Sequence, residues 1–140
     1  MALVVVDDGA LRSCRQLTQQ WPSARFVGLF SNELTMDRHL TIESIEECAF
    51  SGYGGKQELG TFGDPEMQGD RAVAYSVELL WSHDGGPVSD WVVGYFVVDS
   101  DGALLWVEDR DGGPVAMTQG GQTYKVTPAL SAGTRYGATT

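Results

Sequence analysis

The feature that most constrains the fold of this chain is a period of two in the aromatic and branched aliphatic side chains between Arg71 and Glu108. Three segments, 71–81, 91–98 and 103–108, place aromatic and branched aliphatic side chains at a spacing of two. A period of two is typical of β-strands, because successive side chains point to opposite faces of a pleated sheet. The last two segments are joined by Asp99-Ser100-Asp101-Gly102, whose Asp-Gly step favours a tight hairpin turn. We therefore predict a central antiparallel meander that is apolar on both faces and covered by other strands.

The remaining segments add shorter strands and one or two helices. From their patterns we expect an apolar arm at Ala2–Val6, a helix at Ala10–Gln20, a core strand at Arg25–Phe30, a short helix at Ile42–Cys48, an edge strand at Lys56–Phe62, a loop at Gly63–Gly69, and strands at Val115–Met117 and Gln122–Leu130. Asp7 or Asp8 suits the start of the first helix, and Thr41 can cap the second. Pro128 places the last strand at an edge or ends it. The predicted fold class is mainly β: an antiparallel β-sandwich or jelly-roll-like barrel with one or two short helices and an extended N-terminal arm.

The length of 140 residues suits one domain with its own core, and the sequence contains no internal repeat or linker. We expect the N-terminal arm and short helix to occupy residues 1–24 and the antiparallel β domain to occupy residues 25–130. Residues 131–140 are small, polar and glycine-containing, so we expect them to form a flexible C-terminal tail.

The charge of the chain limits its partners. The formal net charge is −10 and the isoelectric point is about 4.4. Phosphate backbones and anionic membranes repel so acidic a protein, so we expect neither nucleic acid nor membrane as a partner. The acidity can also serve solubility alone. The first residues lack a basic start and a long apolar run, so we expect synthesis in the cytoplasm without export by the usual route.

The two cysteines, Cys14 and Cys48, have neither a Cys-x-x-Cys partner nor a Cys/His ligand spacing. A zinc site is therefore not expected. We predict two reduced, buried thiols, and a bridge between them stays open as an alternative.

Two acidic clusters offer the oxygen ligands that calcium prefers, Asp99 with Asp101 and Glu108 with Asp109 and Asp111. Their spacing does not match the twelve-residue calcium loop, and Asp-Gly steps also occur simply as turns. We therefore assign no metal ligand, although calcium binding by an acidic turn stays open.

Catalytic patterns are equally sparse. His39 lies in a polar connection and His83 at a predicted hairpin tip, and no Gly-x-Ser-x-Gly elbow accompanies them. A carboxylate pair for glycoside hydrolysis can assemble from distant residues, so a small hydrolase of the cell envelope is kept as a hypothesis. We predict that the chain is not an enzyme and has no catalytic or cofactor-binding residue.

Three tryptophans bear on sugar binding, because aromatic rings can stack on sugars. Trp81, Trp91 and Trp106 all fall inside strand patterns, which favours packing in the core over an exposed sugar-binding surface.

The order of seven segments along the chain forms a distinctive pattern. The segments are Ala2-Leu3-Val4-Val5-Val6 before a short helix, Phe30-Ser31-Asn32-Glu33-Leu34-Thr35, Thr41-Ile42-Glu43-Ser44-Ile45-Glu46-Glu47, Phe50-Ser51-Gly52-Tyr53, Trp81-Ser82-His83-Asp84-Gly85-Gly86, Val93-Gly94-Tyr95-Phe96-Val97-Val98 and Leu104-Leu105-Trp106-Val107-Glu108. In this order the chain resembles a group of small virion proteins of tailed bacteriophages and prophages. The likeness covers about residues 2 to 130 and includes no catalytic signature.

The resemblance implies a structural component of the phage particle, specifically a capsid decoration (cement) protein on the outer capsid surface. Its implied partners are the major capsid protein and copies of itself, with a homotrimer as one arrangement. The candidate protein–protein contact is the apolar arm Leu3, Val4, Val5 and Val6, which can add a strand to a neighbouring subunit. The alternative is a tail, fibre or baseplate module that binds a host surface glycan, for which Tyr53 or Trp21 is the expected exposed aromatic.

Overall fold

The structure is a computed structural model that describes residues 2–133 and 135–137. It is mainly β, with strands in several antiparallel sheets and one α-helix, as predicted. The chain divides into two compact units. The first holds the chain up to Pro22, Gly60–Glu78 and the chain from Thr127, and the second holds Ser23–Leu59 and Leu79–Val126. Because each unit is assembled from separate segments, no single linker marks the division, and the units do not follow the expected boundaries after residues 24 and 130.

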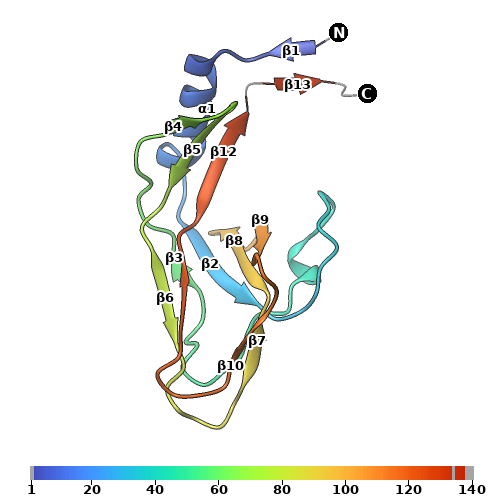
Figure 1. The fold of residues 1–140 in the computed structure, drawn as a ribbon, viewed down its shortest axis with the longest axis vertical. Helices are drawn as coiled ribbons and strands as arrows, with labels where there is room; N and C mark the ends of the chain where they lie inside the picture. Colours follow the sequence, from blue (N-terminus) through green and yellow to red (C-terminus); the bar gives the residue numbers. More distant parts are fainter. Residues whose placement is uncertain (1, 134, 138–140) are drawn as a thin grey trace. The chain divides into compact units, whose positions relative to one another are not determined.

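In the first unit, helix α1 (Asp7–Gln19) packs against a three-stranded sheet (Figure 1). The order of this sheet is β12-β5-β4, from Ala129–Gly133, Arg71–Tyr75 and Glu66–Gln68. The helix buries Ala10, Cys14 and Thr18, and the Thr18 hydroxyl donates to the Cys14 carbonyl at 2.8 Å. A separate two-stranded sheet pairs β1 (Ala2–Val4) with β13 (Arg135–Gly137).

Several expectations for the first unit need correction. The helix begins at Asp7 rather than Ala10, and Asp7 and Asp8 occupy its first turn, where acidic side chains favour the helix dipole. The predicted loop at 63–69 contains β4. Of the predicted flexible tail, residues 131–133 belong to β12 and residues 135–137 to β13, whereas residues 134 and 138–140 lie outside the described part of the chain. Backbone pairing with β5 and β1 creates these strands, and small polar side chains give no sign of it.

The second unit is built on a four-stranded antiparallel sheet in the order β3-β2-β8-β9. Its strands are Gln57–Glu58, Arg25–Phe30, Gly94–Asp99 and Leu104–Asp109. Two further antiparallel pairs join β6 (Leu79–Ser82) to β11 (Thr123–Val126) and β7 (Asp90–Val92) to β10 (Val115–Met117). Figure 1 shows β2, β8 and β9 side by side.

Strand β2 has a core on both of its faces. Val27 and Leu29 pack in one cluster with Trp81 and Met117, among others. Phe30 packs on the other face with Phe96 and Val98. The alternation within Arg25–Phe30 predicts Phe26 and Phe30 on one face and Val27 and Leu29 on the other, and the structure confirms this division.

The predicted central meander is only partly present. The segment 71–81 breaks after Tyr75, so β5 pairs with β12 and β4 whereas β6 pairs with β11. The segment 91–98 also breaks, into β7 and β8. The β8–β9 hairpin is confirmed: Gly102 has a φ of 86° and its N–H donates to the Asp99 carbonyl at 3.0 Å. The alternation identified strands, but pairing between distant segments decided where each one ends.

The second predicted helix is a short 3-10 helix, η1 (Ile42–Ser44). It stops early because the following backbone bonds to β2 instead: the Cys48 N–H donates to the Leu29 carbonyl at 2.9 Å. Strand β11 ends at Val126, two residues before Pro128, in agreement with the expected effect of the proline.

Candidate protein-interaction site

The N-terminal arm, Leu3–Val6, presents apolar side chains to the surface. Leu3, Val4 and Val6 are 61%, 64% and 69% exposed, and Val5 is half-buried. The arm is joined directly to α1, since the Ala10 N–H donates to the Val6 carbonyl at 3.0 Å. The helix therefore holds the base of the arm while the apolar side chains stay accessible.

The arm backbone is paired with the other end of the chain. Leu3 lies opposite Tyr136 and Val4 opposite Arg135, and Figure 1 shows β1 and β13 side by side. Among the described residues this sheet has two strands of three residues each. So small a sheet has little stability of its own in water. Exposed apolar side chains on such a sheet are typical of a surface that binds another protein.

The tryptophans predicted for the core differ in burial. Trp81 is 1% exposed and its indole N–H donates to the Gly55 carbonyl at 3.1 Å. Trp106 is half-buried, with the Arg25 guanidinium 5.8 Å from its ring centroid. Trp91 is 56% exposed, so its predicted place in the core is wrong. It shares a strand with the fully buried Val92, and alternation cannot tell which face of a strand is covered.

The two aromatics expected at a glycan surface are not exposed. Tyr53 is 8% exposed, and Trp21 is half-buried. The Tyr53 hydroxyl donates to Glu47 Oε2 at 2.6 Å and accepts from the Leu29 N–H at 2.9 Å. Burial, and then the hydrogen bond to Glu47, raises the pKa of Tyr53. Tyr53 is therefore a residue of the core.

The two acidic clusters lie in and beside the β8–β9 hairpin, and one of their carboxylates accepts hydrogen bonds within its turn. Asp99 Oδ1 accepts from the N–H groups of Asp101 and Ala103 at 2.9 and 3.0 Å, so this carboxylate stabilises the hairpin turn. Partial burial, with the neighbouring charges of Asp111 and Asp109, raises the pKa of Glu108. Within the described part of the chain, no group of three or more His, Cys, Asp or Glu residues is placed to hold a metal ion.

His83 is buried and its ring is held on both sides. Nδ1 accepts from the Gly85 N–H at 3.0 Å, and Nε2 lies 3.0 Å from the Val88 carbonyl. Since Nδ1 is an acceptor, the proton belongs on Nε2, where it donates to Val88. The imidazole thus ties the 83–88 turn together, whereas His39 is exposed.

The two cysteines are free and buried, which confirms the predicted thiols. Cys14 Sγ lies 3.4 Å from the Leu130 carbonyl, and Cys48 Sγ lies 3.3 Å from the Trp91 carbonyl. Burial is the main cause that raises the pKa of both thiols, that of Cys48 to about 12. Both are therefore poor nucleophiles and poor metal ligands at neutral pH.

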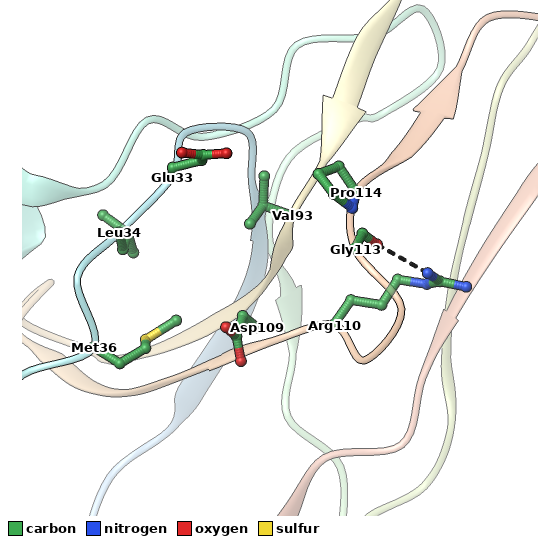
Figure 2. Close-up of a pocket in the computed structure, with 8 residues that line it drawn as sticks. All are labelled: Glu33, Leu34, Met36, Val93, Asp109, Arg110, Gly113 and Pro114. Atoms are coloured by element: carbon green, nitrogen blue, oxygen red, sulfur yellow. Dashed lines mark hydrogen bonds between the residues drawn. The ribbon is translucent and has the colours of Figure 1, made fainter.

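A surface pocket in the second unit was not predicted. It has a volume of about 240 Å³ and is shown in Figure 2. Its lining consists of Glu33, Leu34, Met36, Val93, Asp109, Arg110, Gly113 and Pro114. These residues come from the connection after β2, the break between β7 and β8, and the end of β9 with the turn that follows it. Nothing in the local sequence pattern links those three places.

Comparison of the chain with protein-family models, curated proteins and solved structures finds no match. Across the described residues, no helix has the length and apolar character needed to cross a membrane.

Proposed function

We propose that the chain is a non-enzymatic structural component of a tailed bacteriophage particle, specifically a capsid decoration protein on the outer capsid surface. Support comes from the resemblance of its segment order to small virion proteins and from its mainly β fold. Its net charge of −10 is compatible with a place outside the shell, away from the packaged genome. In this role the protein bridges capsomers and stabilises the shell.

The observation that carries the proposal is the exposed apolar arm. Leu3, Val4 and Val6 are each more than 60% exposed, and the small sheet that holds β1 gains stability when another strand or an apolar surface covers it. The partner for this surface is the major capsid protein or a second copy of the chain. A trimer presents three arms at once, so weak contacts with the shell add together.

The test is binding to expanded capsids that lack the protein. The purified chain is mixed with such particles, and sedimentation measures the bound fraction before and after heating. Val4→Asp places a charge in the arm, whereas Val77→Asp places the same charge at a valine that is 61% exposed elsewhere in the first unit. The proposal expects the native chain and Val77→Asp to bind and protect the particles, and Val4→Asp to lose both effects. Absence of binding by the native chain, or equal binding by both variants, would overturn it.

A second candidate function, adsorption to a host surface glycan as part of a tail or fibre, is favoured by Trp91. Its ring is 56% exposed, and Val88, three residues earlier, is 49% exposed. An exposed indole can stack on a sugar face. This function predicts that Trp91→Ala abolishes adsorption of particles to cells while assembly stays normal. Unchanged adsorption would exclude it.

A further inference from the structure

We propose that the pocket lined by Leu34, Met36 and Val93 binds an arginine side chain of a partner protein, with Glu33 and Asp109 as the acceptors for its guanidinium. This site lies in the second unit and differs in chemistry from the apolar arm. The inference goes beyond the proposed function and does not depend on it.

The pocket has apolar walls suited to an aliphatic stem. Figure 2 shows Leu34 and Met36 on one side, with Val93 and Pro114 on the other. The volume of about 240 Å³ is smaller than the roughly 300–1,000 Å³ of typical small-molecule pockets. A single long side chain therefore fits the space better than a cofactor does. Arginine and lysine both bury such a stem while the charged head stays near polar groups.

The charges at the rim favour a cation. Glu33 and Asp109 contribute two carboxylates, and neither has a hydrogen-bond or ion-pair partner among the residues that the structure describes. The cation in the lining, Arg110, is already engaged: its Nη1 donates to the Gly113 carbonyl at 2.9 Å, and Figure 2 shows the guanidinium directed away from Leu34 and Met36. The lining therefore holds two carboxylates against one guanidinium, and its net charge is negative.

The surroundings reinforce this negative potential. Glu108 precedes Asp109 in β9, and the charges of Asp111 and Asp109 contribute to the raised pKa of Glu108. Such an effect requires carboxylates close enough to repel one another. A bound cation relieves this repulsion, which adds to its attraction for Glu33 and Asp109.

Arginine suits the site better than lysine. Its guanidinium is flat and weakly hydrated, so it loses less hydration free energy than an ammonium group does when it enters a space between apolar walls. Its five N–H donors also point in several directions, which lets one head reach two separate carboxylates.

The test is a titration of the isotopically labelled full chain, followed by the backbone amide signals. The probe is N-acetyl-L-arginine amide, and N-acetyl-L-citrulline amide is its uncharged isostere. Glu33→Gln and Asp109→Asn remove the two charges with little change of shape. Glu58→Gln is the matched control, because it removes an exposed carboxylate from β3, the strand at the opposite edge of the sheet from β9.

We expect the arginine probe to shift the signals of residues 33–36, 93 and 109–113 saturably, with weaker binding at high salt. The citrulline probe should bind the native chain at least roughly fivefold more weakly than the arginine probe does. The arginine probe should lose affinity to the same extent for Glu33→Gln and for Asp109→Asn. Its affinity for Glu58→Gln should equal that for the native chain. N-acetyl-L-lysine amide, titrated in the same way, should bind more weakly than the arginine probe. Shifts that never saturate, equal binding of citrulline or of this lysine analogue, or no effect of the pocket variants would overturn the inference. The arm variant Val4→Asp should bind the probe normally, so failure of the capsid proposal and failure of this site are distinguishable.

Discussion

The Tyr53 hydroxyl donates a 2.6 Å hydrogen bond to Glu47 Oε2 and so connects the core of the second unit to its surface. The same hydroxyl accepts from the Leu29 N–H in β2, and Glu47 Oε1 pairs with Lys56 Nζ at 2.9 Å. One phenol oxygen thereby holds the segment after η1 against β2 of the four-stranded sheet. Removing that oxygen leaves a backbone donor of β2 without its acceptor.

Replacement of Tyr53 by Phe should therefore lower the free energy of unfolding by about 1–3 kcal/mol, because the Leu29 N–H loses its buried partner. Chemical denaturation monitored by tryptophan fluorescence measures this. Tyr75→Phe is the matched control: among the described residues its hydroxyl bonds only to the exposed side chain of Gln68, so a change below about 0.5 kcal/mol is expected. Equal stability losses in the two variants would contradict the role given to Tyr53.

Gly94→Ala should destabilise the protein by about 3 kcal/mol, because an added methyl group has no room there. A Cβ at Gly94 would collide with the Glu108 carbonyl oxygen and lie 2.8 Å from the Asp109 Cα, and backbone atoms cannot move aside as a flexible side chain does. Thermal and chemical denaturation measure the loss. Gly63→Ala is the control, since the nearest atom to its Cβ is 3.9 Å away. A stable Gly94→Ala protein would show that β8 and β9 are spaced differently.

Native Cys48 should react with a thiol reagent at pH 8 roughly a thousandfold more slowly than in denaturant, since its pKa of about 12 leaves little thiolate. Absorbance at the wavelength of the released chromophore follows the reaction. Cys14→Ser isolates Cys48, and the same variant in guanidinium chloride gives the rate of the accessible thiol. Similar rates in both conditions would place Cys48 at the surface.

Glu108 should make the protein less stable as the pH rises. Its pKa is raised from 4.5 in the folded state by partial burial and then by Asp111 and Asp109, so the folded state binds more protons than the unfolded state. The stabilisation is therefore present below pH 4.5 and is lost as the pH rises through the folded-state pKa. Denaturation curves of the native chain and Glu108→Gln across this range measure the effect.

The variant should show a smaller decline in stability with pH, because it has no carboxyl group to ionise at this position. Asp101→Asn, at an exposed turn position of the same hairpin, should keep the decline of the native chain. If the free energy of unfolding of Glu108→Gln fell more steeply with pH than that of the native chain, folding would lower the pKa of Glu108 instead of raising it, which would contradict this prediction.

Local patterns predicted the strand class and the two-sided core of β2, because alternation within Arg25–Phe30 is a property of adjacent residues. They could not predict that the strand pattern breaks after Tyr75, since Val77 keeps the same period while the backbone leaves its partner strand. The exposure of Trp91 was missed for a related reason: burial depends on what lies over a strand.

The candidate sites differ in the same way. The apolar arm could be read directly from consecutive residues, Leu3–Val6. The pocket could not, because Glu33, Val93 and Asp109 come together only through the sheet and its turns. A contiguous interaction segment is visible in a sequence, whereas a pocket made from three connections requires the fold.

A cryo-electron microscopy map of particles induced from the strain that encodes the chain tests the decoration role most directly. We expect density for this fold on the outer shell at capsomer junctions, with Leu3, Val4 and Val6 in contact with the capsid protein or with a neighbouring copy. Density at the tail or baseplate would contradict the decoration role in favour of adsorption. Absence of the chain from the particle would contradict a virion role altogether.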